Sequence, residues 1–368
     1  MRKLVVILPT YNEKGNVGLL ITEIFDKLDT LKNWELSILV VDSKSPDGTG
    51  TEIKKLRKKY PRLYLLEVAK EGLGRAYTQA FSYLEKNINP YLVIQMDADL
   101  SHNPDSLPDL IKKIENGADF VIGSRYIRGG SIPPNWGLHR KFLSVMGNLT
   151  VKLGFMKLRI SDWTSGYRAI KFWLVKKAFQ HIKNYSGYVF QIAFLDFALK
   201  NNAVIGEVPI HFRERKSGVS KINFVQYIFS IFLYIFLHSS FIKFAIVGVL
   251  GFGVDFGISY LMIEILHKAV WISTLLSTET AIISNFIMNN FWSFSDKKIE
   301  GGITKFITSF LKYNLVSSGS IAIQTFGVSL LASLLGKQFW FLYKVTIITL
   351  VVIPYSYFFY NKFIWKSK

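Results

Sequence analysis

Two aspartates, Asp97 and Asp99, carry the strongest chemical signal in this 368-residue sequence. They stand two positions apart, directly after the apolar run Leu92–Met96. Two carboxylates at the end of a strand can hold a hard divalent cation, and that cation can bridge two phosphates. The plainer alternative is a pair of acidic side chains in a solvated loop. A position after a buried strand favours the metal site, because unpaired carboxylates are costly there.

Polar groups also follow two other apolar runs. Pro9–Glu13 follows Leu4–Leu8, and Asp42–Thr49 follows Leu36–Val41. Turn formation alone also accounts for such residues, since Pro, Asn, Asp and Gly favour turns. If the runs are neighbouring parallel strands, these groups face the same crevice as Asp97.

The runs before these motifs have the composition of buried strands. They are rich in Val, Ile and Leu, which suits strands covered on both faces of a parallel sheet: Leu4–Leu8, Leu36–Val41, Leu63–Val68, Leu92–Met96 and Phe120–Ile122. Helical periodicity lies between them, over Val17–Leu31, Thr49–Lys59, Gly74–Lys86 and Pro104–Glu115. This alternation predicts an α/β doubly wound domain, with ligands at the carboxyl ends of its strands.

The last third of the chain has the pattern of a membrane domain. Four apolar stretches reach the roughly 20 residues that cross a bilayer core: Phe241–Leu266, Val270–Phe294, Thr304–Leu335 and Phe339–Ile364. The aromatic segment Asn223–His238 is more interrupted, and we expect it to lie along the membrane surface. The predicted organisation is a catalytic domain at residues 1–222, an interfacial segment at 223–238 and a four-helix membrane domain at 239–368.

The four spans resemble a duplicated hairpin, because one spacing separates both Lys268 from Lys337 and Trp271 from Trp340. Lysines cluster in the middle loop and in the C-terminal tail, while the other two loops have one lysine each. The positive-inside rule then places the catalytic domain and the C-terminus of this integral membrane protein in the cytoplasm, at the cell membrane.

Composition excludes several other classes of function. The net charge of +19 would suit a nucleic-acid partner, yet no nucleic-acid motif is present and the basic residues flank apolar segments, where anionic lipid headgroups would meet them. We therefore expect a lipid bilayer as partner and no nucleic acid. The absence of cysteine excludes disulfides and thiolate metal sites. A homo-oligomer is compatible with the sequence.

Together the motifs resemble those of family 2 glycosyltransferases, whose nucleotide-binding fold is of the GT-A, Rossmann-like type. The resemblance is to dolichyl-phosphate mannose synthases with a fused four-span membrane domain. It extends in order over nearly the whole chain, through Ile122–Tyr126, His139–Lys141, Ser161–Arg168, Gly187–Gln191, Gly206–Ile210 and Arg215–Lys221, and on to Asn285, Asn289, Asn290 and Trp292–Phe294.

The resemblance implies a donor site for a nucleotide sugar. Asp97 and Asp99 would hold Mg²⁺ or Mn²⁺ against the diphosphate, with Ser101 as third metal contact where some relatives have Gln. The groups that line the nucleotide would be Pro9, Tyr11, Glu13 and Asp42, and a loop with Arg215 and Lys221 would close on the phosphates. GDP-mannose is the favoured donor. Many relatives have acidic residues where this chain has Ser43 and Lys44, which leaves UDP-glucose and other UDP-sugars as alternatives.

The resemblance also implies an acceptor site for dolichyl or another polyprenyl phosphate, at Arg125, Arg140 and Ser144. Arg140 begins an amphipathic stretch, Arg140–Phe155, that we place at the membrane surface. A phosphomonoester has a second pKa of about 6, so it is already ionised and needs no general base. Arginine suits its binding because the planar guanidinium forms two parallel hydrogen bonds. Direct attack at the anomeric carbon would invert its configuration, giving a lipid-linked β-glycosyl phosphate.

Two further functions compete with single sugar transfer. A processive polysaccharide synthase would carry a Gln-x-x-Arg-Trp motif, which this sequence lacks. A lipid-linked sugar flippase with an inactive transferase domain would not need the Asp97–Asp99 pair. Polar residues within or near the spans, Asp255, Glu264, Glu279 and Gln324, could serve transport. We favour hydrogen bonding between helices, since polar residues often join spans in this way.

Overall fold

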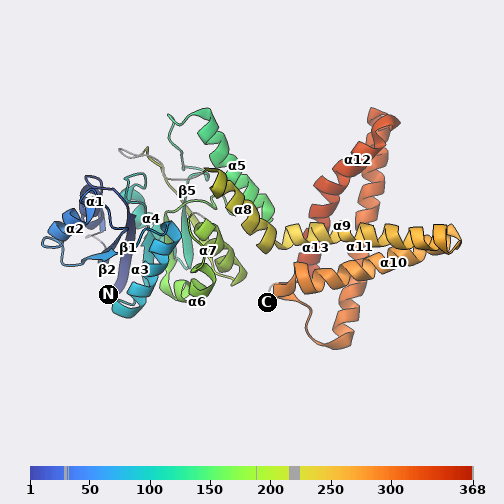
Figure 1. Cartoon of the computed structure of the whole chain (residues 1–368), viewed down its shortest axis with the longest axis horizontal. Coiled ribbons are helices and arrows are strands. Elements are labelled where there is room, and N and C mark those ends of the chain that lie inside the picture. Colours follow the sequence, from blue (N-terminus) through green and yellow to red (C-terminus); the bar gives the residue numbers. More distant parts are fainter. Residues whose placement is uncertain (29–30, 32, 188, 215–223, 367–368) are drawn as a thin grey trace. The chain divides into compact units, whose positions relative to one another are not determined.

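A computed structural model describes residues 1–28, 31, 33–187, 189–214 and 224–366 of the chain. It divides into two compact units, Met1–Tyr234 and Ile235–Lys368 (Figure 1). The first contains a β-sheet with flanking helices, and the second consists of helices.

Within the described residues of the first unit, seven strands form one sheet in the order β3-β2-β1-β4-β6-β5-β7. They are β1 (Arg2–Thr10), β2 (Trp34–Asp42), β3 (Leu63–Glu67), β4 (Leu92–Gln95), β5 (Phe120–Ser124), β6 (Arg168–Lys171) and β7 (Ile205–Pro209). Neighbours pair in parallel except at β6, which runs antiparallel to both β4 and β5. The carboxyl ends of the other strands therefore share one edge with the amino end of β6.

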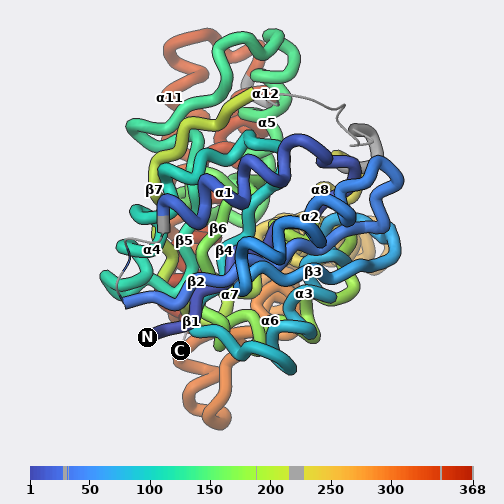
Figure 2. Tube along the Cα trace, turned by 90° about the vertical axis from the view of Figure 1, so that its left-hand side faces the viewer, coloured from blue at the N-terminus to red at the C-terminus, as the bar shows by residue number. Residues whose placement is uncertain are grey.

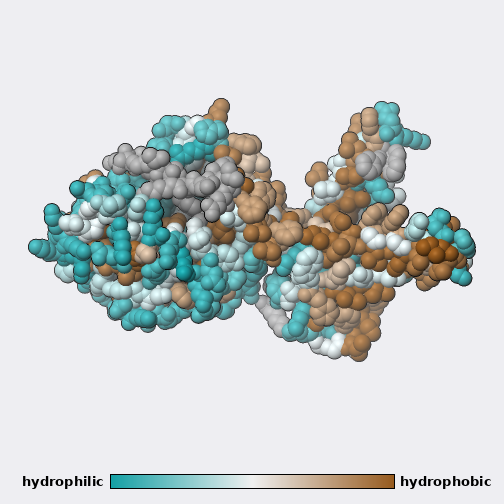
Figure 3. Space-filling view, viewed as in Figure 1, coloured by the Kyte–Doolittle hydropathy of each residue, from teal (hydrophilic) through white to brown (hydrophobic). Residues whose placement is uncertain are grey.

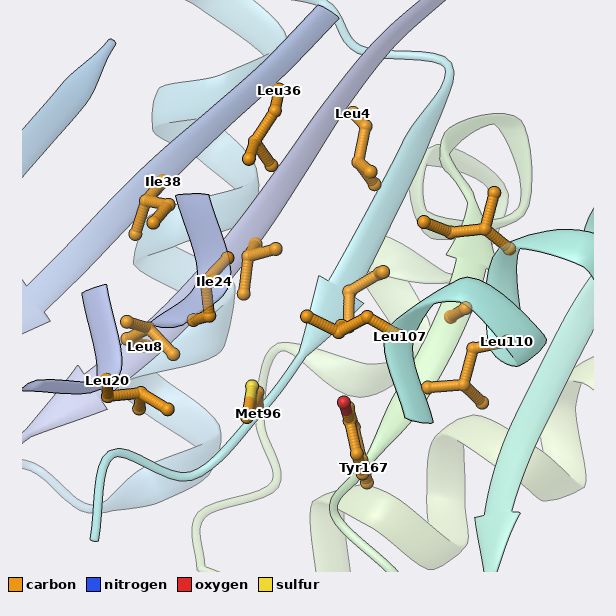
Figure 4. Close-up of a cluster of buried hydrophobic side chains, with 14 of the residues drawn as sticks. Leu4, Leu8, Leu20, Ile24, Leu36, Ile38, Met96, Leu107, Leu110 and Tyr167 are labelled. Atoms are coloured by element: carbon orange, nitrogen blue, oxygen red, sulfur yellow. The ribbon is translucent and has the colours of Figure 1, made fainter. Parts of the chain in front are cut away.

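Helices cover both faces of this sheet (Figure 2). One face packs against α1 (Val17–Leu28), α2 (Thr49–Leu56) and α4 (Leu107–Glu115), and the other against α3 (Leu73–Asn87), α6 (Phe172–Ile182) and α7 (Val189–Lys200). Figure 4 shows Leu4, Leu8, Leu36 and Ile38 from the strands meeting Leu20, Ile24, Leu107 and Leu110 from the helices. Burying each such side chain contributes about 1.5–3 kcal/mol, so this apolar layer is the main stabilising element of the unit.

The predicted doubly wound architecture is confirmed, with corrections in detail. The predicted strands are all present as β1 to β5 and share one direction, as expected, and the structure adds the antiparallel β6 and the edge strand β7. β6 and β7 escaped the prediction because neither is a continuous apolar run: β6 has the sequence RAIK and β7 the sequence IGEVP. The predicted helix Thr49–Lys59 ends earlier, at Leu56, and the described part of the predicted helix Val17–Leu31 is helical over Val17–Leu28. Asn103 starts the 3-10 turn η1 (Pro104–Ser106) before α4, and its side chain accepts a hydrogen bond from the Asp105 N–H.

Two helices, α5 (Leu138–Gly154) and α8 (Phe224–His238), are not among those that cover the two faces of the sheet. α5 lies between β5 and β6 in sequence, and α8 follows β7. α5 corresponds to the amphipathic stretch predicted at Arg140–Phe155. Large apolar side chains on it are exposed, with Leu138 at 85% and Phe142 at 63%.

Four helical segments among the described residues are long and apolar enough to cross a membrane: Ser240–Ile265, Val270–Ser293, Gly302–Leu335 and Leu342–Phe363. They confirm the four predicted spans. They are built from α9 (Ser240–Tyr260), α10 (Val270–Met288), α11 (Gly302–Leu335), α12 (Trp340–Ile347) and α13 (Ile353–Phe363), with π-helical turns η2 (Leu261–Ile265), η3 (Asn289–Ser293) and η6 (Ile348–Val352). Figure 3 shows the apolar surface of these helices in brown.

Asp255 joins two of these spans. Its Oδ1 accepts hydrogen bonds from Ser277 Oγ at 2.7 Å and from Thr278 Oγ1 at 3.2 Å, which link α9 to α10. The interpretation of Asp255 as a contact between helices is thus confirmed. The first two spans pack against each other through α9 and α10, and the last two through α11 with α12 and α13. This pairing agrees with a repeated hairpin.

Candidate functional site

The sheet topology gathers polar loops from distant parts of the sequence at one edge. Loops that follow β1, β2, β4, β5 and β7 emerge there because those strands are parallel. β6 runs the opposite way, so the loop that precedes it, Asp162–Tyr167, reaches the same edge. Backbone hydrogen bonds join these loops directly: Gly123 N–H donates to Tyr167 O at 2.8 Å, and Arg213 N–H donates to Ser101 O at 2.9 Å.

The loop after β4 folds back on itself around its carboxylates. Asp99 Oδ1 accepts hydrogen bonds from the Ser101 N–H at 3.0 Å and from Ser101 Oγ at 2.6 Å. Asp99 is 3% exposed, whereas the Asp97 side chain is 30% exposed. The more accessible carboxylate therefore belongs to Asp97, and Asp99 holds the turn that carries Ser101.

His102 is buried beneath the same loop and contacts both its backbone and Tyr167. Its Nδ1 accepts a hydrogen bond from the Asp97 N–H at 3.0 Å, and its ring stacks on Tyr167 with centroids 4.8 Å apart. Burial lowers the pKa of His102 although the Asp97 carboxylate acts in the opposite direction. The neutral ring therefore carries its proton on Nε2, which lies 3.8 Å from Asp97 Oδ2.

The oxygen atoms of this loop suit a divalent cation that takes its remaining ligands from a bound substrate. Carboxylate and hydroxyl oxygens are the ligands that Mg²⁺ and Mn²⁺ prefer. Within the described ranges, no group of three or more His, Cys, Asp and Glu side chains is arranged as a complete metal site. Opposite Asp97 stands Gly166, where an added Cβ would lie 3.6 Å from Asp97 Oδ1. A larger residue there would narrow the space in front of the carboxylate.

The loops after β1 and β2 are joined through Asp42. Its Oδ1 accepts a hydrogen bond from Thr10 Oγ1 at 2.9 Å, and its Oδ2 accepts one from the Ser45 N–H at 2.9 Å. Asp42 is 2% exposed, so its carboxylate is a buried link between these two loops. Nearby, the Lys70 ammonium lies 3.8 Å from the centroid of the Tyr11 ring.

Pro9 and Glu13 complete the first of these loops. Pro9 is still part of β1, where it is opposite Val41 of β2. Glu13 accepts a hydrogen bond from Asn16 Nδ2 at 3.0 Å and donates its own N–H to Thr49 Oγ1 at 3.1 Å. Arg215 and Lys221, the remaining residues of the expected donor site, lie outside the described residues.

Arg125, directly after β5, is held by a buried ion pair. Its Nε lies 2.8 Å from Asp162 Oδ2 and its Nη2 lies 2.8 Å from Asp162 Oδ1, in the parallel arrangement typical of Arg and carboxylate. The Arg125 side chain is 10% exposed and that of Asp162 is fully buried. Burial alone would raise the pKa of Asp162, but the Arg125 guanidinium and its hydrogen bonds outweigh this and lower it.

Two further charged residues pin the loop that contains Asp162. Glu207 on β7 accepts hydrogen bonds from the Ser161 and Asp162 N–H groups at 3.0 and 3.1 Å. Arg168 on β6 is fully buried and donates to the carbonyls of Trp163 at 2.8 Å and of Ser165 at 2.7 Å. Burial lowers the pKa of Arg168 to about 9, which still leaves the guanidinium charged at neutral pH.

Helix α5 brings Arg140 and Ser144 to the Arg125 side of the site. Ser144 Oγ lies 2.6 Å from the hydroxyl of Tyr126, the residue after Arg125. The Arg140 guanidinium stacks over Trp136 at 3.9 Å from the ring centroid and pairs with Glu214 at 3.2 Å. In contrast with Arg125, the Arg140 side chain is 48% exposed.

Known proteins share both parts of this chain. The glycosyl transferase family 2 model matches residues 5–182, and the GtrA/DPMS transmembrane domain model matches residues 243–365. The sequence is 32% identical over 303 residues to a dolichol-phosphate mannosyltransferase of Pyrococcus furiosus, covering 80% of this chain and 82% of that relative. The chain belongs to glycosyl transferase family 2. It is thus an enzyme that transfers sugars, and it carries a GtrA/DPMS membrane domain.

This glycosyltransferase is also similar to a second relative and to a solved structure. It is 37% identical over 225 residues to a polyprenol monophosphomannose synthase of Mycolicibacterium smegmatis, covering 60% of this chain and 82% of the relative. Among solved structures, glucosyl-3-phosphoglycerate synthase of Mycobacterium tuberculosis in complex with uridine diphosphate is 18% identical, with a TM-score of 0.47, and covers 64% of this chain and 79% of that one.

Sequence reasoning missed residues that organise the Arg125 side of the glycosyltransferase. Asp162, Glu207 and Arg168 were recognised only as parts of matching segments, and no role was expected for them or for Asn148. Each charged residue stands in or beside a short apolar stretch, which is a signal for a buried ion pair. The identity of its partner could not be inferred, because the paired residues are far apart in sequence, by 37 positions for Arg125 and Asp162.

Proposed function

We propose that this glycosyltransferase moves a mannosyl group from GDP-mannose to dolichyl or another polyprenyl phosphate, with inversion at the anomeric carbon. The observation that carries the proposal is the sheet edge itself. It places the acidic loop of Asp97 and the arginine-bearing loop after β5 at the ends of parallel strands, with β6 between them. A site with carboxylates on one side and arginines on the other suits a reaction in which an acceptor phosphate attacks the anomeric carbon while a metal-bound nucleoside diphosphate leaves it. Relatives named for mannosyl transfer to polyprenols support the same choice.

The donor side would be built from the loops after β1, β2 and β4. Asp97, Asp99 and Ser101 would hold Mg²⁺ or Mn²⁺, and Asp97 is the accessible member of this set. When bound, the cation supplies positive charge that offsets the charge developing on the departing diphosphate. Pro9, Tyr11, Glu13 and Asp42 would line the nucleotide. Arg215 and Lys221 would cover the phosphates from the loop after β7.

The acceptor side would be built from Arg125, Arg140 and Ser144. Their cationic and hydroxyl groups suit a phosphate dianion, which attacks without losing a proton because it is already ionised above its second pKa of about 6. Asp162 and Thr164 fix the Arg125 guanidinium through Nε and Nη2, so Arg125 would contribute a preorganised positive charge, whereas the exposed Arg140 can exchange Glu214 for the phosphate. Preorganised donors are effective because they need no rearrangement during the reaction.

The membrane parts would keep the enzyme at its lipid substrate. We place the catalytic domain, residues 1–222, and the C-terminus in the cytoplasm, with the cell membrane as location. The exposed apolar side chains of α5 and the segment 223–238 would lie in the headgroup region. The membrane domain at 239–368 would anchor the protein through its four spans.

A lipid product assay tests this function directly. Purified full-length protein is incubated with dolichyl phosphate and either GDP-mannose or UDP-glucose, with and without Mn²⁺, and the lipid product is weighed by mass spectrometry. We expect a mannosyl lipid from GDP-mannose in the presence of metal, with a β linkage by NMR. A glucosyl lipid from UDP-glucose alone would reassign the donor. A product with retained α configuration would contradict direct attack by the phosphate.

A further inference from the structure

Asn148, on the buried side of α5, joins that helix to the loop of Asp162. Its Oδ1 accepts a hydrogen bond from the Trp163 N–H at 2.8 Å, and its Nδ2 donates to Thr164 Oγ1 at 3.1 Å and to Ser144 O at 3.4 Å. Asn148 is 5% exposed. Turning its amide over would place two donors against each other at Trp163, so the hydrogen bonds determine its orientation.

The hydroxyl of Thr164 is the meeting point between Asn148 and Arg125. It accepts from Asn148 Nδ2 at 3.1 Å and from Arg125 Nη2 at 2.9 Å, and it donates to Asp162 Oδ1 at 3.4 Å. A hydroxyl has one proton and two lone pairs, and here each of them has a role. Rotation of the Thr164 side chain would therefore disturb Arg125 and Asn148 together.

These bonds form part of a closed ring. From Arg125 the ring passes through Thr164 and Asn148 to Ser144, which lies one helical turn before Asn148. Ser144 Oγ then contacts the Tyr126 hydroxyl at 2.6 Å, and Tyr126 is bonded to Arg125 along the chain. A closed ring of short contacts determines how far the first turns of α5 lie from the Arg125 guanidinium.

We propose that Asn148 and Thr164 are positioning residues for the acceptor phosphate, because they fix helix α5, which carries Arg140 and Ser144, relative to Arg125. The inference rests on the proposed function, since it takes Arg125, Arg140 and Ser144 as the acceptor site. None of the hydrogen bonds described above links Asn148 or Thr164 to the carboxylates of Asp97 and Asp99. Their loss therefore acts on the acceptor and leaves donor binding unchanged.

Steady-state kinetics of the full-length protein in detergent separate this role from a merely structural one. Asn148→Ala removes the amide, Thr164→Val removes the hydroxyl at nearly constant shape, and Thr164→Ser keeps the hydroxyl. A matched control is Asn87→Ala, since Asn87 is exposed near the end of α3 and donates to Tyr83 O at 2.8 Å. KM is measured separately for dolichyl phosphate and for GDP-mannose.

We expect Asn148→Ala and Thr164→Val each to raise the KM for dolichyl phosphate about tenfold, as small misplacements of binding groups do. The KM for GDP-mannose should stay within about twofold, and Thr164→Ser and Asn87→Ala should behave like the native protein. The double variant should cost little more than the worse single variant, because both changes cut the same ring. A native acceptor KM in Thr164→Val, or an equal rise in both KM values, would overturn the inference.

Calorimetry with a short-chain polyprenyl phosphate distinguishes the two proposals without turnover. If the native protein binds this phosphate but transfers no sugar from any donor, the proposed function fails. If native protein and Thr164→Val bind it equally well, the positioning role fails whatever the donor. Should Asn148→Ala not fold, as judged by its melting temperature, the comparison of Thr164→Val with Thr164→Ser decides the question.

Discussion

The proposed donor and acceptor sides of the site are built in different ways. On the donor side, Asp99 binds Ser101 two positions away, and the Asp97 N–H binds His102 five positions away. On the acceptor side, Arg125 binds Asp162 and Thr164 at separations of 37 and 39 residues. The donor loop thus organises itself locally, while the acceptor side depends on contacts that only the folded sheet and helices create.

Because of this difference, substitutions at the two places should have different effects on activity and on stability. The side chain of Asp97 is partly exposed, and removing its carboxylate leaves the local turn intact. Asp162 is fully buried against a guanidinium, and removing its carboxylate leaves a charge without its partner. Substitution of Asp97 should therefore affect turnover alone, whereas substitution of Asp162 should affect turnover and folding together.

The largest expected effect tests the donor side. Asp97→Ala and Asp99→Ala should each lower transfer by at least about a hundredfold, the scale seen when a group that stabilises developing charge is removed. EDTA should do the same to the native protein, and Mn²⁺ should restore it. The melting temperature of Asp97→Ala should stay close to native. Full activity in EDTA would remove the metal from the mechanism, and a large loss of stability would contradict the local character of this loop.

Asp162→Ala tests the acceptor side most strongly. It should lower the free energy of unfolding by about 3 kcal/mol, the scale for breaking a buried ion pair, and transfer should fall as Arg125 loses its orientation. Tryptophan fluorescence during denaturation measures the first effect and the lipid product assay the second. A variant with native stability but no activity would make Asp162 a catalytic contact. A variant with native stability and native activity would show that Arg125 finds another partner.

Lysine substitutions compare the two arginines. Arg125→Lys and Arg140→Lys should each lower transfer at least tenfold, about 1.4 kcal/mol of transition-state stabilisation, because an ammonium cannot form two parallel hydrogen bonds. Only Arg125→Lys should also lower the melting temperature, since only Arg125 is buried against a carboxylate. GDP-mannose binding should change little in Arg140→Lys. Near-native rates for both variants at low dolichyl phosphate would leave the acceptor site elsewhere.

The pH dependence of kcat/KM distinguishes ionisation of the acceptor phosphate from ionisation of the protein groups that hold it. The pKa of Asp162 is lowered, so the stability it contributes is complete above the value of 3.8 for the unfolded side chain and is lost only as pH falls through the lower folded value. The ion pair is therefore constant from pH 5 to 8. The acid limb of kcat/KM should instead follow the acceptor phosphate, with a midpoint of about 6. A phosphonate analogue, which ionises at higher pH, should move this limb upward. An unmoved limb would assign it to the enzyme.

Glu214→Gln should have the smallest effect on stability. Its ion pair with Arg140 is exposed on both sides, and such pairs contribute about 0.2–1 kcal/mol. The melting temperature should hardly change, and the KM for dolichyl phosphate should fall slightly as Arg140 is released. This variant is the matched control for Asp162→Ala. A stability loss as large as that of Asp162→Ala would show that the exposed ion pair of Arg140 contributes as much to stability as the buried ion pair of Arg125.

The sequence by itself determined the features that depend on local patterns. The apolar runs of β1 to β5, the carboxylate pair after β4 and the four membrane spans could all be predicted, because strand burial and bilayer thickness impose their patterns on neighbouring residues. The start of the predicted helix at Pro104 belongs to the same class, since the hydrogen bond that the Asn103 side chain accepts comes from Asp105, only two positions away.

Only the tertiary structure decided how the acceptor side is held together. The reversed direction of β6 brings the loop of Asp162 to the edge where Arg125 emerges, and a strand of four residues with charged ends gives no periodic signal of its direction. Glu207 reaches Ser161 across 46 positions, and Asn148 reaches Trp163 across 15. A buried polar group must find a partner, but the partner it finds depends on the path of the whole backbone.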